Sequence, residues 1–208
     1  MIVFSVCDYS GNWSSPYKKA GFHVYRFDPK LPNLPSSGLF PWTVEQLINR
    51  LGYDVPERCD VLLMAPPCTD FSIACNRLWK EKDDDGRTAA SLEIIDACLN
   101  LVRLLRPRVW ALENPVGRLW KLRSELGKPW YFQPCDFGDA YKKKTGLVGS
   151  FTAPLPLFLG KDLSVSPENI CFAALHKGGG EKRRELRSVT PLGFSNAFFQ
   201  CNNLEGVS

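Results

Sequence analysis

Two residues of this sequence could together modify a heteroaromatic ring. Cys68 directly follows the proline pair Pro66-Pro67 at the end of an apolar run, where a thiolate would be rigidly held for nucleophilic attack. Glu113 follows the next predicted strand and could donate a proton to a ring nitrogen. Taken singly, Cys68 is more typical of a small apolar thiol in a turn, and Glu113 of an exposed helix cap. As a pair at neighbouring strand ends, they fit covalent catalysis on a pyrimidine.

Two further segments could bind a nucleotide-like cofactor. The turn over residues 8–13 contains Gly11, whose lack of a side chain lets the backbone approach a ligand closely. Asp28 ends a second predicted strand, where a carboxylate can bind both hydroxyls of an adenosine ribose. The alternative for Asp28 is an ordinary surface carboxylate. Lys142, Lys143 and Lys144 form a basic run that would otherwise be a solvated charge cluster.

Alternating strand and helix patterns position these residues. Short apolar runs predict strands over 2–7, 22–28, 59–65, 108–112 and 146–149. Helical spacing and end signals predict helices over 15–21, 42–51 and 89–105, with a charged loop over 80–86. This alternation predicts a doubly wound α/β sheet. Ligands of such sheets bind at the carboxyl ends of strands, which is where Gly11, Asp28, Cys68 and Glu113 fall.

The composition narrows the class of protein. A length of 208 residues with 44% hydrophobic and 12% aromatic residues predicts one globular domain, or one domain with a small appendage. The formal charge of +4 is compatible with a polyanionic partner without requiring one.

The eight cysteines include no Cys-x-x-Cys pair and follow no signal-like leader, which favours free thiols in a cytoplasmic protein. No apolar run approaches the ~18–20 residues of a membrane span. His23 and His176 lack cysteine partners at ligand spacing, so no metal site is predicted.

The motifs around these residues resemble those of the cytosine-C5 DNA methyltransferases. The segment Pro66-Pro67-Cys68-Thr69-Asp70-Phe71-Ser72 is similar to the family's Pro-Pro-Cys-x-x-Phe-Ser motif, and Glu113-Asn114-Pro115 to its Glu-Asn-Val or Glu-Asn-Pro motif. Residues 141–149 and 187–194 resemble the family's later basic and Arg-x-x-Thr-Pro motifs. The resemblance covers nearly the whole chain, whose compact layout is most similar to small phage-encoded members.

The resemblance implies a Rossmann-like, S-adenosylmethionine-dependent methyltransferase that acts on double-stranded DNA in a bacterium or a phage-infected cell. By it, Cys68 adds to C6 of cytosine and Glu113 protonates N3, while Lys142 and Lys144 take the places of two arginines that hold the base oxygen and a phosphate. The residues implied to bind S-adenosylmethionine are Asp8, Tyr9, Ser10, Gly11, Trp13, Asp28 and Pro66. The residues implied to bind the substrate are Pro67, Ser72, Asn114, Arg187 and Thr190.

The spacing of the motifs predicts the domain organisation and the specificity. Residues 1–149 would form the catalytic domain, 150–186 a minimal recognition loop or subdomain, and 187–208 a segment that returns to the catalytic domain. So small a recognition region can contact few base edges, which predicts short or relaxed sequence preference, or recognition borrowed from a partner or a homodimer. Two other interpretations stay open: a catalytically silent nucleic-acid-binding protein of the same fold, and a C5 methyltransferase of RNA or of a free cytosine nucleotide.

Overall fold

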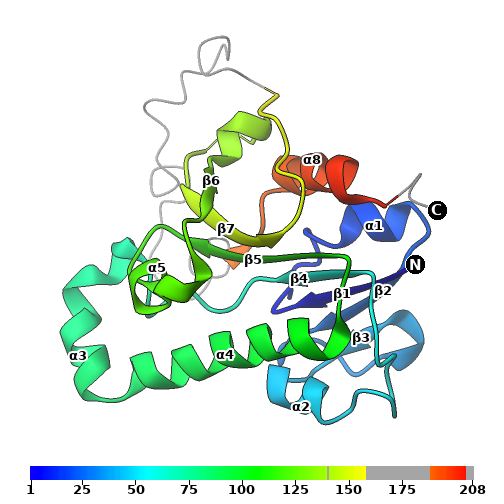
Figure 1. The fold of residues 1–208 in the computed structure, drawn as a ribbon, viewed down its shortest axis with the longest axis horizontal. Coiled ribbons are helices and arrows are strands. Elements are labelled where there is room, and N and C mark those ends of the chain that lie inside the picture. The colour runs from blue at the N-terminus through cyan, green and yellow to red at the C-terminus, as the bar shows by residue number, and fades with distance from the viewer. Residues whose placement is uncertain (140, 158–187, 205–208) are drawn as a thin grey trace.

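A computed structural model describes residues 1–139, 141–157 and 188–204, which form a single sheet with helices on both faces (Figure 1). The strands are β1 (Ile2–Val6), β2 (His23–Phe27), β3 (Leu39–Phe40), β4 (Val61–Met64), β5 (Val109–Pro115), β6 (Trp130–Phe132) and β7 (Thr145–Ser150). The α-helices are α1 (Ser15–Lys19), α2 (Val44–Ile48), α3 (Trp79–Asp84), α4 (Arg87–Leu105), α5 (Leu119–Leu122) and α8 (Leu192–Asn202). Among the described residues, no helix is both long enough and apolar enough to cross a bilayer.

The order of the strands confirms the predicted doubly wound, Rossmann-like α/β fold. The sheet runs β3-β2-β1-β4-β5-β7-β6. Strand β1 pairs in parallel with β2 and with β4, and β4 pairs in parallel with β5, whereas β7 is antiparallel to both of its neighbours. The direction of strand addition therefore reverses between β1 and β4. Open α/β sheets bind ligands outside the carboxyl ends of the strands at such a reversal.

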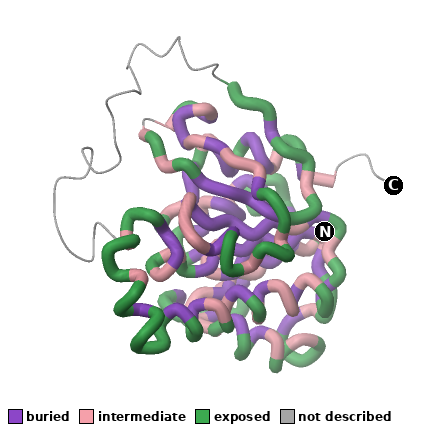
Figure 2. The backbone as a smooth tube through the Cα atoms, turned by 60° about the vertical axis from the view of Figure 1, so that its left-hand side comes forward, coloured by how far each residue is buried: buried purple, intermediate pink, exposed green. Residues whose placement is uncertain are grey.

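The central strands alternate their side chains between two cores. In β4, Leu62 and Met64 pack in a cluster with residues of α2 and α4, whereas Val61 and Leu63 pack in a cluster with residues of α1 and α8. This alternation is the period of two expected of a strand that is covered on both faces. The strands accordingly form the buried middle of the molecule, with exposed residues on the outer sides of the helices (Figure 2).

Strand β5 extends beyond its predicted end at residue 112. It runs to Pro115 because β7 pairs with it throughout, with Glu113 opposite Leu147 and Asn114 opposite Gly146. Glu113 therefore lies in the paired C-terminal part of β5 and not in the loop after it. This pairing restrains the backbone that carries the candidate acid.

The prediction of a charged loop over 80–86 was wrong, because most of that segment is helix α3. The 3-10 helix η2 (Ile73–Leu78) leads into α3, which packs against α4. Lys82 of α3 is buried and forms an ion pair with Asp70. Since the residue that faces the protein interior is a lysine, the segment shows no apolar helical period from which a helix could be predicted. The predicted helix over 42–51 is shorter than expected, and Thr43 and Gln46 form a capping box at the start of α2.

Helix α8 brings the C-terminal residues back onto the sheet. The ring of Phe194 stacks on that of Phe132, with ring centroids 3.9 Å apart, and it also contacts Trp13. Phe194 is fully buried, whereas Leu192 at the start of the same helix is 43% exposed.

Replacing Phe194 with alanine should therefore lower the free energy of unfolding by about 3–5 kcal/mol, because a large buried ring is removed from a packed core. Urea denaturation followed by circular dichroism measures this change. The matched control is Leu192→Ala, which should change the same quantity by less than about 0.5 kcal/mol. Equal losses in the two variants would contradict the placement of α8 in the core.

Candidate active site

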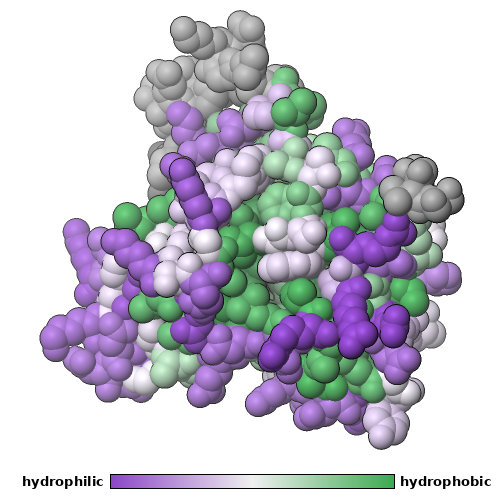
Figure 3. Space-filling model, viewed as in Figure 1, coloured by the Kyte–Doolittle hydropathy of each residue, from purple (hydrophilic) through white to green (hydrophobic). Residues whose placement is uncertain are grey.

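The carboxyl ends of β1, β2, β4 and β5 open on one cavity of about 930 Å³. Seven of the predicted site residues line it: Tyr9, Ser10, Asp28, Pro66, Pro67, Cys68 and Glu113. Its other lining residues include Trp42, Glu45 of α2, Ile94 and Ala97 of α4, and Lys143, Ser188 and Val189. On the face seen in Figure 3, apolar side chains gather at the centre and hydrophilic side chains border them. The structure thus brings the two predicted groups of residues, the pyrimidine-directed pair and the cofactor-directed set, to one cavity.

Cys68 stands at the start of a tight turn after β4. Its carbonyl oxygen accepts hydrogen bonds from the backbone N–H groups of Phe71, at 3.1 Å, and of Ser72, at 2.9 Å. The preceding prolines Pro66 and Pro67 fix their own φ angles. The backbone that carries the thiol is therefore restrained on both sides. The Ser72 hydroxyl accepts a hydrogen bond from the Ala74 N–H and caps η2, and Ser72 is not among the lining residues.

Glu113 is buried in the wall of the cavity, with 6% of its surface exposed. Its Oε1 atom has no hydrogen-bond partner within the described residues and lies 3.9 Å from Nζ of Lys143. Burial raises the pKa of Glu113, and the positive charge of Lys143 opposes that rise. A carboxyl group in this setting retains a proton more readily than an exposed one and can donate it to a ligand.

Asn114, predicted to bind the substrate, makes an internal contact beside the cavity. It is fully buried, and its Nδ2 donates to the carbonyl oxygen of Pro66 at 3.2 Å. This contact ties the end of β5 to the segment before Cys68. The described contacts thus make Asn114 a link between the strand that carries Glu113 and the loop that carries Cys68.

Of the three consecutive lysines, Lys143 is the one that lines the cavity. Lys142 and Lys144, the two named by the sequence motif, are exposed, and the Lys144 ammonium lies 4.9 Å from the centre of the Tyr131 ring. Alternation explains the difference, because side chains one residue apart on an extended segment point to opposite sides. Sequence reasoning missed Lys143, and the strand that begins at Thr145 was the signal that could have found it.

The turn after β1 is held by hydrogen bonds to the side chain of one of its own residues, Asp8. The buried carboxylate of Asp8 accepts hydrogen bonds from the hydroxyls of Ser5 and Ser14, each at 2.8 Å, and from the Gly11 N–H at 2.9 Å. Asp8 is not among the lining residues of the cavity. The side chain predicted to bind a cofactor instead holds the turn in shape, and Tyr9 and Ser10 are the turn residues that line the cavity.

Gly11 and Trp13 also serve the turn and the core. Gly11 has a φ of +74°, and a Cβ atom there would lie 2.6 Å from Cζ of Arg26, whose guanidinium donates to the carbonyl groups of Asp8 and Tyr9. Trp13 is fully buried against Phe194 and Phe198 and does not line the cavity. Its large ring fills the core beneath α8, and its predicted contact with a cofactor stays a prediction.

One carboxylate oxygen of Asp28 forms a hydrogen bond within the loop that follows β2. Oδ1 accepts a hydrogen bond from the N–H of Lys30 at 2.9 Å, which shapes the loop after β2. Burial raises the pKa of Asp28, and the Lys30 N–H and charge oppose that rise. Asp28 lines the same cavity as Trp42 and Glu45, and its carboxylate could recognise polar groups of a ligand there.

Two further predicted residues lie toward the C-terminus. Thr190 is buried, and its carbonyl oxygen accepts a hydrogen bond from Nδ2 of Asn12 at 3.1 Å, so it joins the C-terminal segment to the turn after β1. Arg187 lies outside the described residues, as does His176. Across the described part of the chain, no group of three or more His, Cys, Asp or Glu side chains is arranged to hold a metal ion.

Comparison with known proteins gives structural neighbours only. No family model matches the sequence, and no curated protein matches it. An E. coli protein described as a DNA modification methyltransferase encoded within a prophage is 16% identical, with a TM-score of 0.47, over 87% of this chain and 56% of that one. The Entamoeba histolytica methyltransferase EhMeth is 15% identical, with a TM-score of 0.44, over 88% and 61%. The S. pombe Dnmt2 methyltransferase is 16% identical, with a TM-score of 0.47, over 79% and 58%.

Each of these neighbours is described as a methyltransferase, the class of enzyme that the sequence motifs resemble. The present chain spans less than two thirds of the length of each. Sequence identities near 16% and TM-scores below 0.5 do not transfer an activity.

The raised pKa of Glu113 predicts how the stability of the folded protein depends on pH. Because the pKa is higher in the folded than in the unfolded chain, ionising Glu113 at neutral pH destabilises the fold, and this effect disappears as the pH falls below the ordinary value of about 4.5. Glu113→Gln should therefore melt at a higher temperature than the wild type at pH 7, and the difference should shrink as the pH approaches 4.5. Scanning calorimetry over this pH range measures it.

The matched control is the exposed Glu57, whose change to glutamine should leave no comparable pH-dependent difference. A Glu113→Gln variant that melts below the wild type at pH 7 would contradict the raised pKa of the buried Glu113 carboxyl group.

Proposed function

We propose that this protein transfers a methyl group from S-adenosylmethionine to C5 of cytosine in DNA through a covalent bond between Cys68 and C6. The observation that carries the proposal is the convergence of Cys68, Glu113 and Asp28 on one cavity. A nucleophile, a proton donor and a ribose-binding carboxylate in one cavity are the groups that this reaction needs.

The residues near Asp28 fit S-adenosylmethionine. The Asp28 carboxylate would accept hydrogen bonds from the ribose hydroxyls, and the ring of Trp42, together with Ile94 and Ala97, provides apolar walls for a purine. When bound, S-adenosylmethionine supplies an electrophilic methyl group. Glu45 also lines the cavity and is a carboxylate that the sequence motifs did not indicate. Asp8, Gly11 and Trp13 would contribute by holding the turn that presents Tyr9 and Ser10.

The proposed chemistry at cytosine follows from the positions of Cys68 and Glu113. The Cys68 thiolate adds to C6, while protonated Glu113 gives its proton to N3. The electrons of the C5–C6 double bond shift within the ring, and C5 becomes nucleophilic. After methylation, C5 loses its proton to water, the bond between Cys68 and C6 breaks, and Glu113 recovers its proton from N3. A buried carboxyl with a raised pKa is suited to both transfers.

Lys143 would be the basic group at the target base. Its Nζ lies 3.9 Å from Oε1 of Glu113, so it would lie close to the exocyclic O2 oxygen of the base, which neighbours N3. The exposed Lys142 and Lys144 would contact backbone phosphates, where a lysine serves as a point charge. Pro66 and Pro67 would form the floor on which the base and the methyl donor meet.

Double-stranded DNA is the proposed substrate, and its target base must be extruded to reach the cavity. The segment 150–186, proposed as the recognition loop, lies largely outside the described residues, as does the start of the C-terminal segment 187–208. Because this segment is short, we propose a short or relaxed sequence preference, or recognition supplied by a second copy of the chain or by a partner.

The central test follows labelled methyl groups from S-adenosylmethionine into DNA. Wild type and Cys75→Ser should label cytosine in DNA, whereas Cys68→Ser should lose more than roughly a thousandfold in turnover, because the nucleophile is removed. Cys75 is a fair control because it lies seven residues on and does not line the cavity. DNA containing 5-fluorocytosine should trap a covalent adduct with wild type and with Cys75→Ser only.

The same assay separates the alternatives. Label entering RNA or free dCMP in preference to DNA would move the chemistry to another substrate. Absence of label in all three, together with no binding of S-adenosylhomocysteine by calorimetry, would favour a catalytically silent nucleic-acid-binding protein. An adduct that persists in Cys68→Ser would remove Cys68 from the mechanism.

The three lysines should differ in their kinetic effects. Lys143→Met should lower kcat about 10- to 100-fold, as expected for loss of one charged contact made in the transition state, and should move the Glu113 limb of the pH–rate profile to higher pH. Lys142→Met and Lys144→Met should mainly raise KM for DNA and reduce its salt dependence. A large loss of kcat in Lys142→Met with normal kcat in Lys143→Met would reverse this assignment.

A further inference from the structure

A buried lysine holds the loop that carries Cys68. Lys82 of α3 has only 2% of its surface exposed. Its Nζ donates to the carbonyl oxygen of Thr69 at 2.6 Å and forms an ion pair with Oδ1 of Asp70 at 2.8 Å. The other carboxylate oxygen of Asp70 accepts a hydrogen bond from the hydroxyl of Ser91 at 2.5 Å. The two residues that follow Cys68 are thus both bound to one ammonium group.

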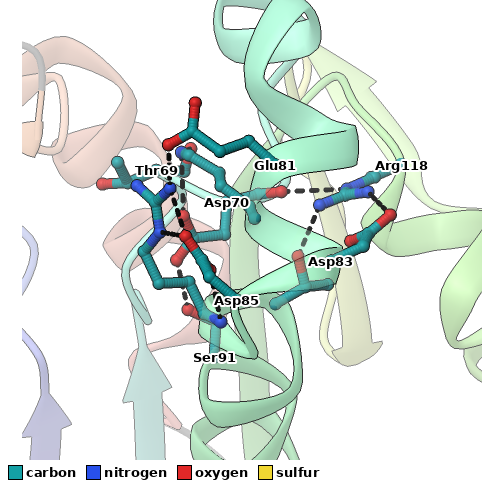
Figure 4. A network of polar contacts seen from close by, with 10 residues as sticks. Thr69, Asp70, Glu81, Asp83, Asp85, Ser91 and Arg118 are labelled. Carbon is teal, nitrogen blue, oxygen red and sulfur yellow. Dashed lines mark hydrogen bonds and ion pairs between the residues drawn. The ribbon is translucent and has the colours of Figure 1, made fainter.

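A second cation holds the same loop from the other side. Nε of Arg118 donates to the carbonyl oxygen of Asp70 at 3.0 Å, while its Nη1 and Nη2 bind Asp83 at 2.8 Å and Thr88 at 2.6 Å (Figure 4). Asp83 belongs to α3 and Thr88 to α4. Figure 4 shows Arg118 and Asp70 meeting between these helices. The loop, α3 and the start of α4 are therefore joined in one polar network.

Packing alone does not explain why a lysine occupies position 82. Taking an ammonium group out of water carries a penalty that an ion pair only partly repays, so a well-packed apolar residue would often serve stability as well. The lysine does what an apolar residue cannot, since it binds a main-chain carbonyl of the residue next to Cys68. Burial raises the pKa of Asp70, but hydrogen bonds from Lys82 and Ser91 outweigh that effect and the net pKa is lowered, so Asp70 stays ionised at neutral pH.

We propose that Lys82 is a positioning residue for the nucleophile: by binding the Thr69 carbonyl and the Asp70 carboxylate, it fixes the backbone from which the Cys68 thiol reaches C6 of the base. This inference rests on the proposed function of Cys68. Lys82 does not line the cavity and acts through the loop, with Arg118 as the second restraint. An error of about 1 Å in the placement of a reacting group can reduce a rate 100-fold.

The test compares Lys82→Met with Lys80→Met in the full chain. Lys80 lies two residues before Lys82 in the same helix and is exposed, with its ammonium 3.0 Å from Asp84. Lys82→Met should lower kcat for methyl transfer by roughly 10- to 100-fold with KM for S-adenosylmethionine unchanged, because the loop and not the cofactor end of the cavity is disturbed. Lys80→Met should behave as wild type. A parallel loss of kcat and of cofactor affinity in Lys82→Met would overturn the proposal.

A second variant separates positioning from folding. In Lys82→Met the Asp70 carboxylate is left without its cation, so the double variant Asp70→Asn/Lys82→Met should recover melting temperature while the Thr69 carbonyl remains unbound. Its kcat should stay low. Recovery of kcat together with stability would show that Lys82 serves folding only and would overturn the proposal.

Hydrogen exchange gives a readout that needs no activity. The amides of Phe71 and Ser72, which donate to the Cys68 carbonyl, should exchange faster in both Lys82 variants, while amides of β4 exchange as in wild type. If wild type transfers no methyl group, the proposed function fails, and this measurement still decides whether Lys82 holds the loop. Unchanged exchange at Phe71 and Ser72 would overturn the proposal.

Discussion

The candidate site depends on hydrogen bonds between two loops that the sheet alone would not hold together. Parallel pairing of β4 with β5 fixes the strands up to Met64 and Leu112, and the reactive residues lie beyond these positions. From there, the Arg118 N–H donates to the Phe71 carbonyl at 2.9 Å, and the Ile73 N–H donates to the Val116 carbonyl at 3.0 Å. Gly117 permits this approach, since a Cβ atom there would lie 1.9 Å from the Phe71 oxygen. The separation of thiol and carboxyl is therefore set by contacts between residues far apart in the sequence.

The antiparallel strand β7 completes the site from the opposite side of β5. Its pairing extends β5 to Pro115 and places Glu113 opposite Leu147. The segment that enters β7 then carries Lys143 toward Glu113, while Gly146 leaves room for the ring of Trp120, which would approach a Cβ atom there to 3.0 Å. A purely parallel continuation would need a crossover connection at this edge. The reversed direction of β7 instead places Lys143, just before the start of that strand, close to the candidate acid near the end of β5.

The predicted site residues that line the cavity lie at strand ends, whereas those whose direction depends on packing lie outside it. Cys68 and Asp28 could be placed because an apolar run marks each strand and its last residue marks the ligand edge. Lys143 was missed, because which lysine of the run faces inward depends on where β7 begins and how it pairs with β5. Trp13 was assigned to a cofactor, but the core beneath α8, which no local pattern reveals, takes its ring. Lys82 was hidden for the same reason, since its burial depends on a partner, Asp70, elsewhere in the sequence.

The distance between Glu113 and Lys143 balances two requirements. At 3.9 Å the ammonium is too far from Oε1 for a hydrogen bond, yet close enough for its charge to oppose the effect of burial. A shorter, hydrogen-bonded pair would keep the carboxylate ionised and unable to donate a proton to a ring nitrogen. With no cation nearby, burial would favour the neutral acid at every stage and hinder the release of its proton. The partial compensation leaves a carboxyl group that can give up a proton and take it back, which is what a step that both forms and breaks a covalent bond at the same ring requires.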